Sequence, residues 1–294
     1  MSFNEEWEKI KLEELVDIEH GYAFKGKYFS NDVTNIILLT PGNFKIGGGF
    51  KNSKIKYYKE NGDLPEEYIL NSNDLIVTMT DLSKNGDTLG YPALVPDSEN
   101  VYLHNQRLGK VIFKNNRVNK KFLYYKMCTR EYRHEILATS SGTTVHHTAP
   151  DRILNYKLKL PPLKEQKAIA GILSSLDKKI ENNNQMNETL EEIAQAIYKS
   201  WFVDFEPFQD GNFIETELGM IPEGWEVKKL GTIVDVLDKK RNPISKRERA
   251  KIKGEYPYYG ATSVMDYVDD YLFEGRNVLM AEDGSVMDDN GNPV

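Results

Sequence analysis

Residues 163–205 read LKEQKAIAGILSSLDKKIENNNQMNETLEEIAQAIYKSWFVDF, and this stretch decides how the chain is organised. It holds no proline and only one glycine, Gly171, and residues that favour helices dominate it. Pro161 and Pro162 precede it and Pro207 follows it, which sets both ends of a helix. The stretch therefore predicts one long helix between two flanking modules.

An apolar seam runs along this predicted helix in alternating steps of four and three residues. Its positions are Ile169, Leu173, Leu176, Ile180, Asn183, Asn187, Leu190, Ala194, Ile197 and Trp201. Such a heptad pattern is typical of a coiled coil, and polar residues at its middle are of the kind that fix register. The seam covers 33 residues, which is about 50 Å of helix. An ordinary amphipathic helix packed on its own domain is the alternative.

The sequence repeats itself on the two sides of this helix. WEKIKL at residues 7–12, followed by VDI at 16–18, returns 218 residues later as WEVKKL at 225–230, followed by VDV at 234–236. A repeat at one fixed offset indicates two copies of one module. The second copy has only 70 residues, from Trp225 to Val294. We therefore expect a truncated module that is too short to complete the same core.

The first module alternates short apolar runs with polar loops, which is typical of a mixed α/β domain. Strands are predicted at residues 35–39, 74–78 and 110–113, and a helix at 120–138. Loops rich in Gly, Asn and Lys connect them, and binding residues usually lie on such loops. The predicted fold class is α+β. Its parts are a mixed α/β domain at 1–160, a spacer helix at 161–206, a linker at 207–224 and a truncated α/β domain at 225–294.

The net charge of −7 disfavours a nucleic-acid partner, but the charge is unevenly distributed. Residues 1–160 carry 22 basic and 20 acidic side chains, whereas 161–294 carry 16 and 25. From Arg107 to Lys159, twelve basic side chains stand against three acidic ones. A basic face on the first module fits contact with phosphates, although a merely solvated surface would have the same composition.

Composition also limits the other classes of protein. No segment has the roughly eighteen consecutive apolar residues of a membrane helix, and the first ten residues lack a signal-peptide pattern. We therefore expect a cytoplasmic protein. The single cysteine, Cys128, excludes an intramolecular disulfide and a cysteine-based zinc site, so no metal site is predicted.

Two motifs resemble enzymatic sites, and both are weak. GYAFKGKY at 21–28 departs from the phosphate-binding loop G-x-x-x-x-G-K-[ST] at Tyr28, which cannot place a small hydroxyl on Mg²⁺. Asp151, Glu165 and Lys167 imitate the two carboxylates and the lysine of a Mg²⁺-dependent nuclease. However, Glu165 falls in the first turn of the predicted helix, where an acid simply complements the helix dipole. We predict no catalytic residue, and the nuclease remains an alternative.

Several segments resemble the specificity subunits of type I restriction-modification systems, and together they span nearly the whole chain. They are SGTTVHH at 141–147 with LKLPPLKEQ at 158–166, the helix with SWFVDFEPF at 200–208, and ELGMIPEGW at 217–225. The first pair resembles the close of a target recognition domain. The second resembles the central helical spacer, and the third resembles the entrance to a second recognition domain.

The resemblance implies a non-catalytic DNA-binding subunit that works with partners. Family members carry two recognition domains, each reading half of a split target, held apart by two long antiparallel helices. The implied partners are two modification subunits, which carry S-adenosylmethionine and methylate adenine, and a restriction subunit that uses ATP and Mg. No cofactor is expected in this chain. Because the second spacer helix is missing here, we expect the seam to pair with another copy or with a modification subunit.

Candidate DNA contacts lie on the loops of the first module. Asn and Gln can bridge adenine and Arg can bridge guanine in the major groove, whereas Lys and small polar side chains suit phosphates. The base-edge candidates are Asn43, Asn52, Asn85, His104, Asn105, Gln106 and Arg107. The phosphate candidates are Lys25, Lys27, Lys45, Lys51, Lys54, Lys84, Thr143, Thr144 and His146. A coiled-coil scaffold without a DNA role is a third interpretation of the chain.

Overall fold

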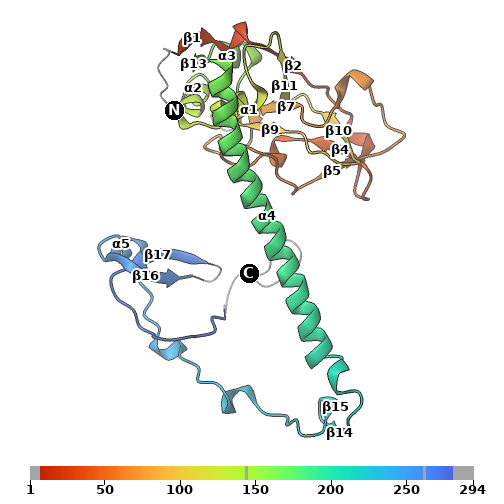
Figure 1. The fold of residues 1–294 in the computed structure, drawn as a ribbon, viewed down its shortest axis with the longest axis vertical. Coiled ribbons are helices and arrows are strands. Elements are labelled where there is room, and N and C mark those ends of the chain that lie inside the picture. Colours follow the sequence, from red (N-terminus) through yellow and green to blue (C-terminus); the bar gives the residue numbers. More distant parts are fainter. Residues whose placement is uncertain (1–6, 143–144, 261–262, 281–294) are drawn as a thin grey trace. The chain divides into compact units, whose positions relative to one another are not determined.

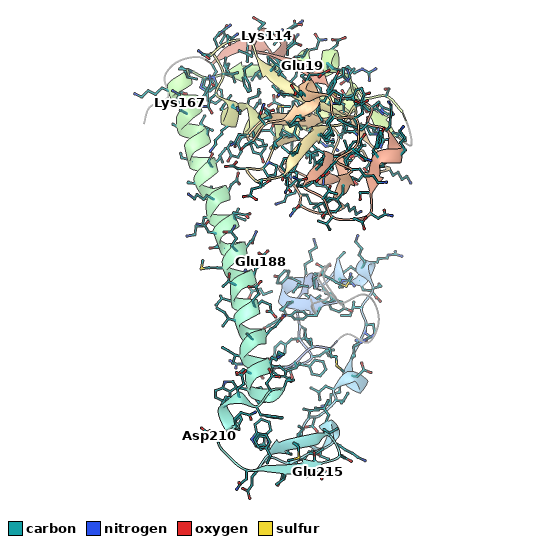
Figure 2. All side chains as sticks on the ribbon, turned by 90° about the vertical axis from the view of Figure 1, so that its right-hand side faces the viewer. Glu19, Lys114, Lys167, Glu188, Asp210 and Glu215 are labelled. Atoms are coloured by element: carbon teal, nitrogen blue, oxygen red, sulfur yellow. The ribbon has the colours of Figure 1, made fainter. Side chains whose placement is uncertain are left out.

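The computed structural model describes residues 7–142, 145–260 and 263–280. The chain forms two compact units, residues 1–192 and 193–294, and their boundary falls inside the long helix α4 (Leu163–Phe202) (Figure 1). Lys167 and Glu188 mark the course of α4 in Figure 2. The predicted fold class and the predicted long helix are confirmed. The predicted domain limits at residues 160, 206 and 224 stay predictions.

Two sheets form the frame of the first unit. The five-stranded sheet has the order β3 (Phe29–Ser30), β5 (Lys56–Tyr58), β4 (Ile36–Leu39), β10 (Val101–His104), β6 (Ile69–Leu70). The four-stranded sheet has the order β2 (Val16–His20), β11 (Leu108–Phe113), β7 (Leu75–Thr78), β9 (Pro92–Leu94). Strands β4 and β10 run parallel, and the other pairs run antiparallel. The predicted strands at 35–39, 74–78 and 110–113 are thus confirmed as β4, β7 and β11.

Two short ladders and three short α-helices also belong to the described part of this unit. The ladders are β1 (Glu8–Lys11) with β13 (Lys157–Leu160), and β8 (Thr80–Asp81) with β12 (His146–His147). The helices are α1 (Lys120–Met127), α2 (Arg130–Ala138) and α3 (Pro150–Leu154). The prediction of one helix over 120–138 was wrong, because Thr129 begins α2 as its N-cap and accepts a hydrogen bond from the Tyr132 amide at 3.4 Å.

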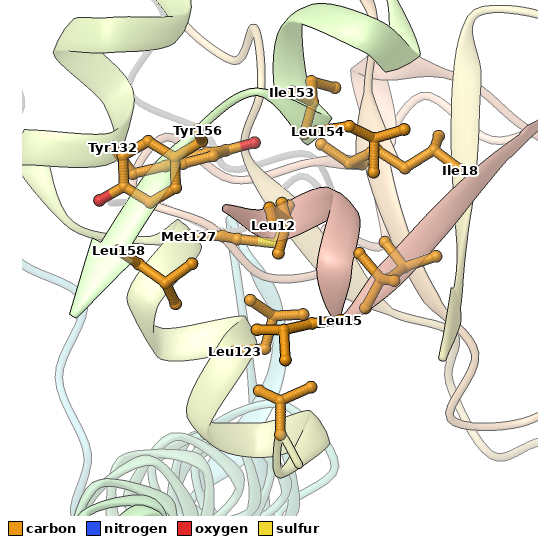
Figure 3. Packing of buried hydrophobic residues seen from close by; sticks show 14 of the residues in the cluster. Leu12, Leu15, Ile18, Leu123, Met127, Tyr132, Ile153, Leu154, Tyr156 and Leu158 are labelled. Carbon is orange, nitrogen blue, oxygen red and sulfur yellow. The ribbon is translucent and has the colours of Figure 1, made fainter. Parts of the chain in front are cut away.

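The largest core of the first unit lies between the four-stranded sheet and the short helices α1, α2 and α3 (Figure 3). Leu12 and Leu15 follow β1, and both are almost fully buried against α1 and α3 side chains. The Tyr132 and Tyr156 rings pack edge to face in this core, with centroids 5.0 Å apart. Burial of such side chains contributes roughly 1.5–3 kcal/mol each, so this core fixes the frame on which the loops stand.

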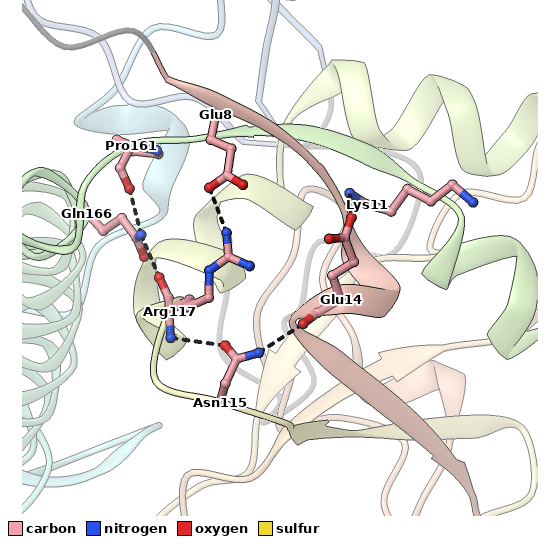
Figure 4. Close-up of polar contacts among 7 residues, drawn as sticks. All are labelled: Glu8, Lys11, Glu14, Asn115, Arg117, Pro161 and Gln166. Carbon is pink, nitrogen blue, oxygen red and sulfur yellow. Dashed lines mark hydrogen bonds and ion pairs between the residues drawn. The ribbon is translucent and has the colours of Figure 1, made fainter.

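Helix α4 is anchored to the first unit at its start (Figure 4). Gln166 is only 1% exposed, and its Nε2 donates to the carbonyls of Pro161 at 2.8 Å and Arg117 at 2.9 Å. Its Oε1 accepts from the Asn119 amide at 2.7 Å. Ala170 is buried in the core one turn later. The first turns of the helix therefore pack on their own domain, as the alternative interpretation of the seam expected.

The second unit is built from small hairpins and an aromatic cluster. Strands β14 (Phe213–Thr216) and β15 (Gly219–Pro222) form one hairpin, and β16 (Lys253–Tyr259) and β17 (Val264–Val268) form another. The short helix α5 (Lys246–Arg249) precedes β16. The Trp225 ring lies 5.4–5.8 Å, centroid to centroid, from three phenylalanine rings: Phe202, Phe205 and Phe208.

The second copy of the repeat reproduces part of the first. A 3₁₀ turn at Leu230–Thr232 lies 218 residues after the turn at Leu12–Glu14. Residues 226–229 and 234–237, however, form no strand, although their counterparts belong to β1 and β2. In the first module these strands pair with β13 and β11. Residues 226–229 and 234–237 have no such pairing among the described residues, and an isolated strand is not stable.

Candidate nucleic-acid interface

Four polar loops leave the first unit at one edge. The pairings of Leu39 with His104, of His20 with Gly109 and of Thr78 with Leu108 place the carboxyl ends of β2, β4, β7 and β10 together. We call the loops that follow these ends, residues 21–28, 40–54, 79–88 and 105–107, the loop edge. Most of the candidate DNA contacts belong to it.

Backbone hydrogen bonds join three of the four loops, residues 21–28, 79–88 and 105–107, to one another. The loop 40–54 is held instead by hydrogen bonds of its own and by one from the Gly49 amide to the Pro92 carbonyl at 2.8 Å. The Tyr22 amide donates to the His104 carbonyl at 2.8 Å, and the Gln106 amide donates to the Tyr22 carbonyl at 3.0 Å. The Met79 amide donates to the Arg107 carbonyl at 2.9 Å, and the Thr148 amide donates to the Met79 carbonyl at 3.0 Å. Gly21 allows the loop of residues 21–28 to pass this close to the turn of residues 105–107, because a Cβ at Gly21 would lie 2.3 Å from the Asn105 carbonyl oxygen. Loops fixed in this way hold their side chains in a defined order, which recognition of a regular partner requires.

The loop of residues 40–54 presents Lys45 and Lys51 to solvent on its two arms. Its tip bends through three consecutive glycines, 47–49, with φ between 94° and 102°, a region that disfavours other residues. Asn43 is fully buried beneath the arms. It accepts from the Thr40 amide at 2.9 Å and donates to the Ser53 carbonyl at 3.2 Å. The structure thus gives Asn43 a structural role, which corrects its selection as a base contact.

The turn between β10 and β11 separates a buried histidine from exposed polar side chains. His104 is 2% exposed, and its Nε2 donates to the Leu108 carbonyl at 3.0 Å. Burial lowers the pKa of His104 to about 4, so the ring is neutral at pH 7 and belongs to the core. This corrects its selection as a base contact. Gln106 and Arg107 are exposed, and the Asn105 side chain accepts from the Arg107 amide at 2.9 Å.

The loop of residues 79–88 is organised by Asp81, which sequence reasoning missed. Its carboxylate accepts from the Ser83 amide and from the Thr88 hydroxyl, each at 2.6 Å. Burial opposes the charge, but hydrogen bonds from Thr88 and Ser83 outweigh it and lower the pKa of Asp81. The spacing of Asp81 and Ser83 is that of an Asx turn and could have revealed this role.

Lys84 and Asn85 are exposed at the tip of this loop, next to His146. His146 Nε2 donates to the Lys84 carbonyl at 3.1 Å, and β12 pairs with β8. The structure therefore brings Lys84, Asn85 and His146 together. Thr143 and Thr144 were also predicted to contact phosphates, and they lie outside the described residues.

The remaining candidates are exposed on the same loops. Lys25, Lys27, Asn52 and Lys54 are all solvent-accessible. The Lys25 amine lies 3.6 Å from the Asp63 carboxylate, an exposed pair that contributes little to stability. The exposed residues of the loop edge are thus mostly Lys, Asn, Gln and Arg, the donors that suit phosphates and base edges.

The residues of the nuclease alternative do not form a metal centre in the described part of the chain. Glu165 Oε2 accepts a hydrogen bond from the Trp7 indole at 3.1 Å. Asp151 lies in the first turn of α3, and Lys167 is exposed on α4. No group of three or more His, Cys, Asp or Glu side chains suited to a metal occurs among the described residues.

Helix α4 carries a second candidate surface, its apolar seam. Ile169 packs against the core and Leu173 is half-buried, so these two are occupied by their own domain. Farther along, the apolar seam residues have exposed fractions of 48–61%: Leu176, Ile180, Leu190, Ile197 and Trp201. Asn183 and Asn187 are exposed between them. None of the helices in the described residues combines the length and apolar character that crossing a membrane requires.

Comparison with known proteins gives one consistent family. The family described as "Type I restriction modification DNA specificity domain" matches residues 4–192 and 222–290, and these segments contain both copies of the repeat. The MjaIX specificity subunit of a type I restriction enzyme from Methanocaldococcus jannaschii is 30% identical over 239 residues, which are 79% of this chain and 52% of the relative. The EcoBI specificity subunit from Escherichia coli is 29% identical over 245 residues, 80% of this chain and 48% of the relative. This chain thus spans about half the length of these curated relatives.

A solved structure supports the fold. The S subunit of a type I restriction-modification system from M. genitalium aligns with a TM-score of 0.56 and 17% identity, covering 92% of this chain and 64% of that one. At this identity, the similarity concerns the fold alone.

Proposed function

Because the chain belongs to the type I restriction modification DNA specificity family, we propose that its first module reads DNA sequence for a type I restriction-modification complex. The observation that carries the proposal is the loop edge. Three of its four loops are joined to one another by backbone hydrogen bonds, and all four expose Lys, Asn, Gln or Arg side chains where the core strands end. A duplex laid on such an edge meets phosphate contacts and base contacts together.

The exposed side chains divide into two roles in this proposal. Gln106 and Arg107 stand on the short turn between two core strands, so their positions are well defined, and they read base edges in the major groove. Lys45, Lys51 and Lys84 stand on longer loops and contact phosphates, which sets the orientation of the duplex without reading its sequence. Asn52 and Asn85 are further base-edge candidates beside them.

The chemistry in this proposal belongs to partner subunits. The chain contributes recognition, while modification subunits carrying S-adenosylmethionine methylate adenine and a restriction subunit consumes ATP with Mg. This division fits the loop edge, whose exposed polar side chains suit hydrogen bonding. Its one buried carboxylate, Asp81, already accepts hydrogen bonds from the turn that it organises. The chain would then act in the cytoplasm, where its DNA lies.

In this proposal, the apolar seam of α4 is the surface that binds a partner helix. Side chains from Leu176 to Trp201 leave an exposed apolar row that is costly in water and that another apolar helix would cover. Asn183 and Asn187 interrupt the row and would fix the register of the pair. The partner helix comes from a second copy of this chain or from a modification subunit.

Sequencing of methylated adenines in cells tests the proposed function. Cells that carry this chain with its modification partner should show adenine methylation at one sequence motif, and cells with the partner alone should not. Methylation that is the same with and without this chain would contradict the proposal. Mg²⁺-dependent cutting of DNA by the purified chain would instead favour the nuclease.

A further inference from the structure

Four lysines face each other across the ladder of β1 and β13. Lys9 pairs with Lys159, and Lys11 pairs with Lys157. The residues between them, Ile10 and Leu158, are 4% and 2% exposed and point into the core. Because side chains alternate between the faces of a strand, the four lysines share the outer face. We call Lys9, Lys11, Lys157 and Lys159 the lysine ladder.

The positive charge of the lysine ladder is only partly neutralised. The Lys11 amine lies 2.9 Å from a Glu13 carboxylate oxygen and 3.3 Å from the Asn155 side-chain oxygen. Within the described residues, no ion pair involves the side chains of the other three ladder lysines. Two glutamates rim the same surface and are already engaged. Glu131 pairs with Lys126 at 2.5 Å, and Glu14 accepts from the Lys11 amide at 3.1 Å.

The ladder lines a hollow of about 420 Å³ with these two glutamates on its rim. Like charges placed directly opposite on paired strands destabilise the pairing, so two such pairs side by side are unfavourable unless an anion neutralises them. The Cβ atoms of opposed lysines are about 5 Å apart, and the two lysines of one strand are roughly 7 Å apart along it. This surface fits a ligand with negative charges in regular rows.

We propose that the lysine ladder binds the phosphate backbone of duplex DNA outside the bases that the loop edge reads. The backbone carries one charge per roughly 1.7 Å of duplex, whereas an acidic protein surface mixes charges of both signs. The ladder also contains Lys157 and Lys159, which belong to the basic segment of the first module. This inference rests on the proposed function, since it assigns a second contact to the same DNA.

The lysine ladder and the loop edge lie near opposite ends of β2. Strand β2 follows β1 after a short turn and ends at His20, where the loop edge begins. Its five residues span about 17 Å. A duplex that reaches both surfaces therefore extends beyond the base pairs that the loop edge contacts.

Salt dependence of DNA binding tests this inference. The probe is a fluorescent random-sequence duplex of about 30 base pairs, roughly three helical turns, titrated with the full chain at several salt concentrations. The double variant Lys9→Gln with Lys159→Gln removes one opposed pair. It should reduce the slope of log K against log salt by about 2, because each lost phosphate contact removes about 0.9. The matched control is Lys59→Gln with Lys120→Gln, which removes two exposed lysines of the same unit from other elements and should leave the slope within error.

Several outcomes separate the possibilities. Circular dichroism melts must first show that both variants fold like the parent chain, which removal of like charges from an exposed ladder should not prevent. Equal slopes for the ladder variant and the parent chain would overturn the inference, even if the chain binds DNA. Loss of co-purification with a modification subunit at an unchanged slope would also overturn it and assign the ladder to a protein surface. If the parent chain binds no DNA at all, the proposed function itself fails.

Discussion

Arg107 stands on a turn of only three residues, 105–107, between two core strands, so its backbone has little freedom. We expect Arg107→Ala to weaken binding to the target by about 1–3 kcal/mol and to relax the preference at one base position. Fluorescence anisotropy with target and random duplexes measures this. Equal losses on both duplexes would remove Arg107 from the residues that read bases.

Lys51 illustrates the other role at the loop edge. Its side chain is exposed on an arm of the 40–54 loop, and its amide donates to the Asn43 carbonyl at 2.7 Å. Lys51→Ala should weaken binding to every sequence alike and reduce the salt slope by about 1. The same titrations at several salt concentrations provide the test, and a loss confined to one sequence would contradict a phosphate contact.

His104 predicts a pH dependence of stability. Burial holds its pKa at about 4 in the folded chain, below the roughly 6.5 of an unfolded histidine. Its neutral ring therefore stabilises the fold above pH 6.5, and this contribution, on the order of 3 kcal/mol, is lost as the pH falls toward 4. His104→Gln should be less stable than the parent chain at pH 7, and the difference should shrink between pH 6.5 and 4. Urea unfolding at each pH measures it, with exposed His134→Gln as control; a constant difference would contradict the assignment.

Gln166 predicts the strength of the joint between α4 and the first module. Gln166→Ala leaves the Asn119 amide and the carbonyls of Arg117 and Pro161 without their partner in a buried site. We expect a loss of roughly 2–4 kcal/mol in the free energy of unfolding. Gln185→Ala, at an exposed position of the same helix, should have little effect. Similar unfolding midpoints for both variants would show that the joint does not depend on Gln166.

Single residues were the hardest feature to predict from the sequence. Asn43 and His104 belong to polar segments and have the chemistry of base contacts, yet both are buried. Their partners, the carbonyls of Ser53 and Leu108, become neighbours only through the turns of the folded chain. Composition shows that a loop is polar, but it does not show which of its polar side chains are buried and hydrogen-bonded within the fold. Lys45, Lys51 and Arg107, which have longer side chains, remain exposed.

Elements were predicted better where their pattern is long. The 40 residues of α4 repeat one period many times, so its existence and approximate ends were evident. The segment 120–138 has the composition of one helix, but the hydroxyl of Thr129 caps a new one. Residues 226–229 repeat the sequence of a strand without forming one, since a strand requires a partner that lies far away in the sequence.

The exposed seam of α4 predicts association that a polar substitution should abolish. Ile180 and Leu190 are 58% and 61% exposed, so aspartate at both positions should not disturb the first module. We expect the parent chain to form a dimer or to bind a modification subunit, and Ile180→Asp with Leu190→Asp to do neither. Analytical ultracentrifugation measures this, with Asn182→Asp and Asn184→Asp as a control of equal charge. A parent chain that is a monomer and ignores the modification subunit would contradict the role of the seam.

At the scale of the whole molecule, duplication predicted the organisation of the chain. Two matched segments, 4–192 and 222–290, contain the two copies, and α4 lies between the repeats. The repeated tryptophans occupy comparable places at the two ends of this helix. Trp7 donates to Glu165 near its start, and Trp225 packs on Phe202 at its end.

Selection of duplexes by the purified chain tests sequence reading by the first module most directly. The chain is mixed with a pool of random duplexes, and the bound fraction is sequenced after several rounds. We expect enrichment of one short motif, and Arg107→Ala should lose the preference at one position while retaining the others. Bound duplexes that show no common motif at any salt concentration would contradict sequence recognition by this chain.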